Sequence, residues 1–298
     1  MRKGVFSLLA AAFAWSWPSV MIRMLRTDFD VFSQSFFRYV AATVFMFAFG
    51  LIFMRGKISD VAGNLKTLLI PSVIMTVHQV FYTAGLFMTP AVISSLVGRL
   101  NAIIIPALSC VFYEDERQVV KNRGFLLGAI LSFAGVLVVI LGKGAEIAGG
   151  FNVGSVLVVL GTLCWSVYAV YVKKLVRSID PLAIISYVSL LSTVFFFPLV
   201  LFFGDIRSIS SASIETQSLL YGSGILGVGI GNVFYNHAVK HVGTSIASVF
   251  FLLMPLSVGV IGFLILGEAL TTVQIIAGAV SILGCWIVTR LAKNSEED

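Results

Sequence analysis

The chain has 298 residues, of which 58% are hydrophobic and 11% charged, with a mean hydropathy of +1.02 and a formal net charge of +6. Soluble domains carry about 25% charged residues, so this composition excludes a soluble fold of this length. We assign the excess of Lys and Arg to loops that set membrane orientation, and not to nucleic-acid binding.

Ten apolar stretches follow one another along the chain. A helix that crosses a bilayer needs roughly 20 mostly apolar residues, so the sequence predicts an all-α membrane protein with ten transmembrane helices. The expected spans are residues 4–25, 33–54, 68–87, 92–112, 124–141, 154–172, 182–203, 219–239, 245–266 and 273–291. The first span follows two basic residues, as a signal peptide does, but its apolar part continues past Pro18 and nine spans follow. We therefore expect a retained first helix with a kink at Pro18.

The basic residues are divided unequally between the two sides of these spans. With the N-terminus placed inside, the inner segments hold 14 Lys and Arg and the outer segments hold 4; Arg38 and Arg99, inside spans, complete the total of 20. Cytoplasmic loops attract Lys and Arg. We therefore expect a multi-pass protein of the cell membrane with both termini in the cytoplasm.

The two halves of the chain resemble each other. An amide followed by Val-Phe-Tyr occurs at residues 79–82 and again 153 residues later at 232–235. Four further pairs recur at an offset of 150, namely Gly4/Gly154, Trp15/Trp165, Ser16/Ser166 and Asp30/Asp180. We therefore expect a first five-helix repeat at 1–141, a connecting loop at 142–153, a second five-helix repeat at 154–292 and a polar tail at 293–298.

Because five is odd, two such halves in one chain must cross the membrane in opposite senses. The sequence thus predicts two inverted five-helix repeats. Folds of this kind hold their substrate near the midplane between the halves, which exchange inward-open and outward-open shapes. The expected mechanism is alternating access.

One stretch in the second half carries a family resemblance. It reads Val242-Gly243-Thr244-Ser245-Ile246-Ala247-Ser248, then Met254-Pro255, then Leu266-Gly267-Glu268. With the two repeats, this pattern resembles the drug/metabolite transporter (DMT) superfamily and, within it, the EamA-like family. The first half departs from the pattern, since Ile103 aligns with Pro255 and Asp115-Glu116 replaces Gly-Glu.

The resemblance implies a secondary transporter similar to bacterial-type exporters of amino acids and related metabolites. It also implies a central cavity lined by helices 1, 3, 4, 6, 8 and 9, with helices 5 and 10 at the periphery. We expect no enzymatic activity, cofactor, metal or catalytic residue. The expected partners are a small-molecule substrate and the lipid bilayer, without nucleic acid.

Charged residues inside the spans are the first candidates for a substrate site. Arg99 lies mid-span, where a charge costs at least about 2.5 kcal/mol, and we expect it to meet a substrate carboxylate or phosphate. The alternative is a structural contact with helix-end carbonyls or a buried polar side chain. Arg38 lies near the outer end of its span, so we expect its side chain to reach the outer surface. Asn101 need not share a helical face with Arg99.

Polar and aromatic residues at repeated positions complete the predicted site. Each repeated segment places an amide three residues before a phenol, so both groups lie on one helical face. The two repeated tryptophans are candidates for stacking on an apolar or aromatic substrate. The alternatives are interhelical hydrogen bonds for the amide–phenol pairs and interfacial positions for the tryptophans. The predicted substrate-binding residues are Arg99, Gln79, Tyr82, His78, Asn232, Tyr235, Trp15 and Trp165.

The sequence also indicates what could drive transport. No Asp or Glu lies deep inside a predicted span, whereas proton-driven carriers commonly use buried carboxylates. We expect exchange or uniport, or proton coupling through His78, which shares a helical face with Tyr82. For His237 we expect a packing role. The five glycines between residues 222 and 231 favour close helix packing or a gate, and the chain has no Walker loop that would indicate ATP.

Other functions are open at this point. The main alternative is a transporter of another class of anionic metabolite, such as a sugar phosphate or a nucleotide-related compound. An intramembrane enzyme would pair Ser223 with His237 or His241. The 14 residues from Ser223 to His237 already span about 21 Å of helix, too far for a nucleophile and its base. A channel or a structural subunit would not require an inverted repeat.

Overall fold

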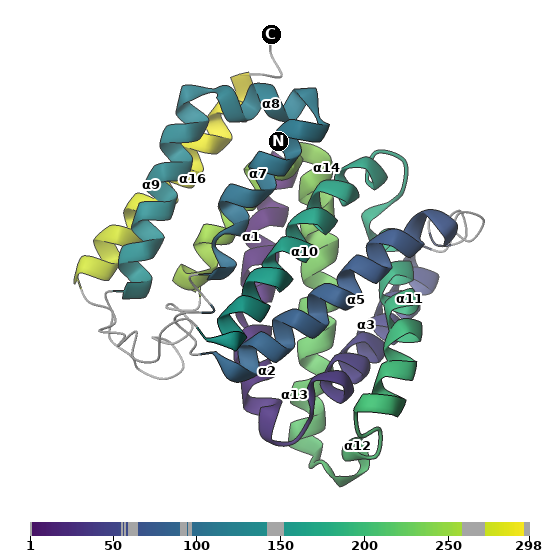
Figure 1. Ribbon diagram of the computed structural model, residues 1–298. Coiled ribbons are helices and arrows are strands. Elements are labelled where there is room, and N and C mark those ends of the chain that lie inside the picture. Colours follow the sequence, from purple (N-terminus) through teal and green to yellow (C-terminus); the bar gives the residue numbers. More distant parts are fainter. Residues whose placement is uncertain are drawn as a thin grey trace.

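The computed structural model describes residues 2–54, 56, 58, 65–89, 94, 97–141, 152–257 and 272–294. These residues form a bundle of helices without a strand among them (Figure 1). The first half holds α1 (Arg2–Ser16), α2 (Pro18–Met24), η1 (Leu25–Thr27), α3 (Val31–Phe53), α5 (Leu65–Met88), α7 (Asn101–Phe112), α8 (Glu114–Lys121) and α9 (Arg123–Leu141). The second half holds α10 (Val153–Leu175), α11 (Pro181–Phe203), α12 (Ser208–Ser211), α13 (Ile214–Gly224), the π-helix η3 (Ile225–Ile230), α14 (Gly231–Val249), η4 (Phe250–Leu253) and α16 (Thr272–Asn294).

The helices have the length and composition of membrane spans. In the described ranges, six helical stretches are long and apolar enough to cross a membrane, or seven if α8 and α9, which are bent by 72°, form one span. Asn101–Phe112 and Ile275–Val288 are shorter apolar helices. Parts of the predicted spans 92–112 and 245–266, with Gly267 and Glu268, lie outside the described residues. The all-α multi-pass architecture is confirmed, and the number of ten spans stays a prediction.

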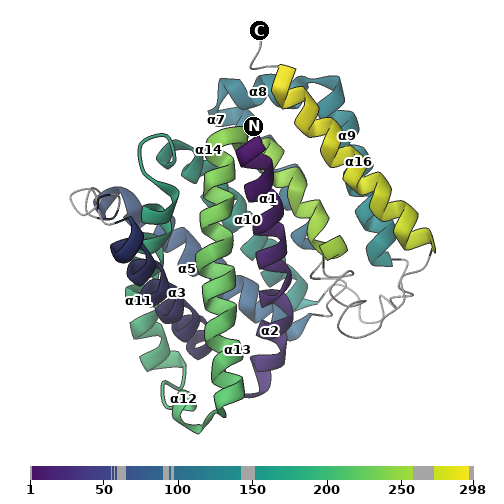
Figure 2. The same ribbon diagram turned by 180° about the vertical axis from the view of Figure 1, so that it is seen from behind.

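Equivalent helices of the two halves pack in reciprocal pairs. Helix α1 of the first half packs on α14 of the second half. In the reciprocal pair, α10, the counterpart of α1, packs on α5, the counterpart of α14. Helix α3 packs on its own counterpart, α11 (Figures 1 and 2). Helices α9 and α16 form a separate pair at one edge of the bundle in both views. They correspond to the fifth and tenth predicted spans, which the family resemblance places at the periphery.

Equivalent residues of the two halves also contact each other directly. Thr43 Oγ1 lies 3.2 Å from Thr193 Oγ1, at an offset of 150. Ser132 Oγ donates to the carbonyl of Ser281 at 3.0 Å, and Ser281 Oγ donates to the carbonyl of Ser132 at 3.1 Å. Such mutual contacts are what a two-fold relation between the halves requires, since each partner meets the other in the same way. The geometry supports the predicted inverted repeat.

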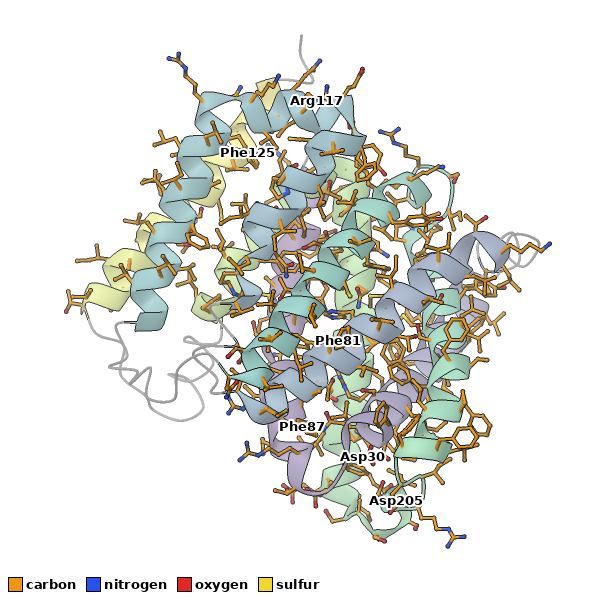
Figure 3. All side chains as sticks on the ribbon, viewed as in Figure 1. Asp30, Phe81, Phe87, Arg117, Phe125 and Asp205 are labelled. Atoms are coloured by element: carbon orange, nitrogen blue, oxygen red, sulfur yellow. The ribbon has the colours of Figure 1, made fainter. Side chains whose placement is uncertain are left out.

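Both halves begin their second long helix with the same cap. Asp30 Oδ1 accepts from the backbone N–H groups of Phe32 and Ser33, at 2.8 and 3.0 Å, and Asp180 Oδ1 accepts from that of Leu182 at 3.0 Å. A capping carboxylate satisfies helix N–H groups that have no partner within the helix, which explains this repeated pair. Figure 3 shows Asp30 beside Asp205 at one end of the bundle and Arg117 at the other end.

Two connections differ from the sequence prediction. Residues 113–123, which lie between two predicted spans, contain a separate helix, α8, with three acidic residues in its first turn. A loop is also predicted between spans 219–239 and 245–266, but α14 passes through this region with a single non-helical residue, Gly243 (φ 78°, ψ 172°). One residue in this conformation is enough to redirect the chain, so no loop is needed.

Replacement of Gly243 by alanine is expected to destabilise the protein. Its backbone conformation is essentially restricted to glycine and costs other residues on the order of 1–3 kcal/mol. The added Cβ would also lie 2.5 Å from Glu116 Oε1. Thermal unfolding in detergent should therefore show a lower midpoint for Gly243→Ala. Gly222→Ala is the control, since no neighbouring atom of the described residues lies within 4 Å of its added Cβ. Equal midpoints for the two variants would contradict the strain at Gly243.

Candidate functional site

A cavity lies between the two halves of the bundle. Its volume is about 130 Å³. A cavity needs roughly 10–15 Å³ to hold a single water, so the space suits a small metabolite. The described lining residues are Trp15, Pro18, Ile22, Arg38, Tyr39, Met75, His78, Gln79, Tyr82, Gly98, Arg99, Asn101, Thr162, Trp165, Gly227, Val228, Asn232, Phe251 and Met254.

Seven of the eight predicted site residues line this cavity, namely Trp15, His78, Gln79, Tyr82, Arg99, Trp165 and Asn232. The exception is Tyr235, which is fully buried behind the cavity wall. Its ring centroid lies 5.5 Å from those of Trp15 and Trp165 and 5.4 Å from that of Phe251. Tyr235 therefore supports the aromatic wall, and substrate contact by the other seven stays a prediction.

The two repeated tryptophans contact each other across the interface of the halves. Their rings meet edge to face with centroids 5.4 Å apart. Trp15 also stacks on Phe251, with centroids 5.2 Å apart, and donates from Nε1 to the carbonyl of Gly227 at 2.9 Å. Both rings line the cavity inside the bundle, so the alternative of interfacial-belt positions does not apply.

The position of Arg99 is compatible with both roles weighed from the sequence. It lines the cavity, and its Nη1 donates to the backbone carbonyl of Phe251. Phe251 is the residue of the second half that aligns with Arg99 at an offset of 152. Arg99 and Leu100 form a turn directly before α7. Asn101, the first residue of α7, lines the same cavity and accepts from Ser166 Oγ at 2.9 Å.

The prediction for Arg38 is wrong. Instead of reaching the outer surface, the side chain is buried, with 3% of the residue exposed, and it lines the cavity. Its Nε donates to Ser223 Oγ at 3.0 Å. A Cβ on Gly224 would overlap the backbone of Arg38, so α13 lies directly on α3 at this point and closes the outward path. Arg38 is thus a second cationic group of the site.

The amides of the two repeated segments are held by local bonds. Gln79 Nε2 donates to Thr83 Oγ1 at 2.6 Å within α5. Asn232 Nδ2 donates to the carbonyls of Gly227 and Val228, both at 3.0 Å, at the end of the π-helix. In a π-helix each turn holds an extra residue, which frees carbonyls for side-chain donors and is frequent at functional sites. The amides therefore do not link helices through these bonds.

His78 lies between the aromatic wall and α10. Its Nδ1 is 2.8 Å from the carbonyl of Gly161, and because a carbonyl only accepts, Nδ1 carries a proton. The ring stacks on Tyr82 with centroids 5.4 Å apart, as the i, i+4 spacing predicts. The expected packing role of His237 agrees with its bond to Ser7 Oγ, at 2.9 Å.

The glycine-rich segment packs closely, as expected. Added Cβ atoms on Gly224, Gly227, Gly229 and Gly231 would meet residues of α1, α2 and α3, whereas Gly222 faces open space. Ser223 Oγ donates to the carbonyl of Leu220 at 2.7 Å and accepts from Arg38. These bonds occupy the hydroxyl and give no support to a nucleophile–base pair with His237.

A buried ionic cluster, which the sequence does not predict, joins the halves at the end of the bundle where α1 begins. Glu116 is 2% exposed, and its carboxylate lies 2.6 Å from Lys173 Nζ. It also accepts from the backbone N–H groups of Thr244 and Ser245, at 2.7 and 3.0 Å. The sequence places Glu116 correctly at a helix end, but the burial arises from α10 and α14 packing around it. We call these four residues the Glu116 clamp.

A multi-pass helical bundle that encloses a polar and aromatic cavity between two related halves has the architecture of a small-molecule transporter. The chain belongs to the EamA-like transporter family, whose pattern matches residues 2–141 and 152–290. This confirms the resemblance to the DMT superfamily.

Known proteins agree with this assignment. The chain is 24% identical to an "Uncharacterized transporter" of Haemophilus influenzae over 284 residues, covering 93% of each chain. It is 22% identical over 297 residues to a "Probable terminal-alkyne amino-acid exporter" of Streptantibioticus cattleyicolor, covering 97% of this chain and 94% of the relative. A solved crystal structure with 19% identity aligns over 99% of both chains with a TM-score of 0.77, which shows the same fold.

Proposed function

We propose that the protein is a secondary transporter that exports small metabolites by alternating access, with amino acids or related compounds as the favoured cargo. The observation that carries this proposal is the cavity between the halves, where Arg38 and Arg99 face aromatic walls. None of the described lining residues is Asp or Glu. A cavity with this charge favours cargo that bears an anionic group.

Amino acids suit the site better than the other anionic metabolites. The carboxylate matches a guanidinium, and the aromatic walls accept an apolar side chain. One relative of similar length is named as an amino-acid exporter. Sugar phosphates and nucleotide-related compounds are the second candidate, since two guanidinium groups would also bind phosphate.

The proposed transport is exchange or uniport, or is coupled to protons through His78. Both the start of α1 and the end of α16 lie at the same end of the bundle (Figures 1 and 2). We propose that this end faces the cytoplasm, because the inner segments hold most of the Lys and Arg.

Counterflow in proteoliposomes tests the proposed function. Vesicles would be preloaded with a mixed pool of unlabelled amino acids and exposed to one labelled amino acid at a time. Saturable accumulation of a label would support a carrier and identify its cargo. Flux that does not saturate would contradict alternating access. Accumulation of labelled sugar phosphates or nucleotides, with none of any amino acid, would favour the second candidate.

A further inference from the structure

Four residues that line the cavity have a buried polar side-chain atom without a hydrogen-bond partner among the described residues. They are Arg38 Nη1 and Trp165 Nε1, which donate, Asn232 Oδ1, which accepts, and the hydroxyl of Tyr39. Arg38 and Asn232 are each 3% exposed, and Arg38 carries the only charge among the four. Buried polar groups are hydrogen-bonded in most proteins, so an unsatisfied cationic donor and an unsatisfied acceptor in one cavity indicate a ligand that carries an acceptor and a donor.

The guanidinium group of Arg38 is held in place by Ser223 and Gly227. Its Nε is bonded to Ser223 Oγ at 3.0 Å, and Ser223 is held in turn by the carbonyl of Leu220. A Cβ added to Gly227 would lie 3.3 Å from Arg38 Nη2. The guanidinium group therefore packs against the π-helix η3. Nη1 is the group that these contacts leave without a partner, and a cationic donor of this kind prefers a carboxylate.

The orientation of the Asn232 amide follows from its neighbours. Nδ2 faces the carbonyls of Gly227 and Val228, which can only accept. A flipped amide would set its oxygen against two carbonyl oxygens. Oδ1 must therefore be the free atom, and it can only accept. Because both Arg38 and Asn232 contact Gly227, the free donor and the free acceptor belong to one small region.

We propose that Arg38 and Asn232 form the subsite that receives the head group of a free α-amino acid, with the carboxylate on Arg38 Nη1 and the ammonium group on Asn232 Oδ1. The inference rests on the proposed function and specifies it. An α-amino acid carries an anionic acceptor and a cationic donor on one carbon atom, which suits this pair. A simple carboxylic acid would leave the Asn232 oxygen without a donor, and an amine would leave Arg38 without an anion. A sugar phosphate could reach the Asn232 oxygen only through a neutral hydroxyl group.

The subsite has no counterpart in the second half of the chain. We therefore expect the cargo to bind in one orientation only. Arg38 aligns with Val188 of the second half at the offset of 150. The two-fold relation therefore provides no second copy of the carboxylate partner. We expect one amino acid per transport cycle, with its side chain toward Trp15 and Trp165.

Counterflow with matched analogues tests the subsite in the full-length protein. The labelled amino acid that gives the fastest wild-type counterflow would be compared with its deaminated acid and its decarboxylated amine. Wild type is expected to transport both analogues at least about tenfold more slowly, because each leaves one buried polar group unpaired. Arg38→Met should reduce the preference for the amino acid over the amine. Asn232→Leu should reduce the preference over the deaminated acid.

The two variants are thus expected to lose different preferences. This difference separates substrate recognition from a purely structural role of the two residues. Asn236→Leu is the matched control, since Asn236 is a buried amide one turn further along α14 that does not line the cavity. It is expected to leave both preferences unchanged. If Arg38→Met does not fold, Arg38→Lys retains the charge and should still raise the half-saturation concentration for the amino acid.

The outcomes distinguish this inference from the proposed function. Folded variants of Arg38 and Asn232 that keep both wild-type preferences would overturn the subsite and leave the transporter standing. Wild-type protein that accumulates organic acids or phosphates but no amino acid would also overturn the subsite alone. Wild-type protein without saturable flux of any of these compounds would overturn both.

Discussion

Arg99→Ala is expected to lower counterflow of the preferred anionic or zwitterionic substrate at least about tenfold, because a hydrogen bond to a charged group contributes roughly 1.5–3 kcal/mol. Arg99 is one of two guanidinium groups on the described cavity wall, and no described lining residue is acidic. Its removal weakens attraction for an anionic group. It also removes the bond to the Phe251 carbonyl, which links the first half to the second.

The measurement is the initial rate of counterflow at several substrate concentrations, with folding checked by thermal unfolding in detergent. Arg26→Ala is the control, since Arg26 is an exposed residue of η1 that does not line the cavity. Unchanged uptake kinetics in folded Arg99→Ala would refute a role in substrate binding. A normal rate with a much lower unfolding temperature would assign Arg99 to the structural contact with Phe251.

The general architecture can be predicted from the sequence because it depends on local signals. Apolar length marks the spans, and the recurrence of Trp15 as Trp165 marks the halves. Seven predicted site residues line one cavity, and five of them, Trp15, Trp165, Gln79, Tyr82 and Asn232, occupy repeated positions that come together where two related halves meet. Tyr235 shares a helix with Asn232 but is buried behind the wall, since Phe251 and both tryptophans cover its ring.

The features that sequence reasoning missed depend on contacts between distant segments. The depth of Arg38 in its span suggested an outward path, but Gly224 brings α13 onto its backbone and closes it. Asn101 lines the cavity from the first position of α7, directly after the turn at Arg99 and Leu100. Glu116 follows an acidic run that is typical of a solvated helix end. Its burial becomes visible only when Lys173 and Thr244 are placed around it.

The second large effect is expected at the Glu116 clamp. Glu116→Leu should lower the free energy of unfolding by about 3–5 kcal/mol, because it leaves the buried cation of Lys173 without this partner. Lys173 is 5% exposed and retains Asp115, whose side chain is largely in solvent. The substitution also removes the acceptor for the N–H groups of Thr244 and Ser245, which start the helix after Gly243. Denaturant titration in mixed micelles would measure the loss, with the exposed Glu114→Leu on the same helix as control.

The double variant Glu116→Leu, Lys173→Met separates the two contributions. Apolar residues of similar volume can replace a buried ion pair without loss, so this variant should recover the part that is due to the unpaired cation. The part due to the two N–H groups should persist, because no apolar side chain can accept from them. Full recovery to wild-type stability would contradict the capping role of Glu116. A double variant as unstable as Glu116→Leu alone would show that Asp115 already compensates Lys173, and that Glu116 acts through the helix start in the second half.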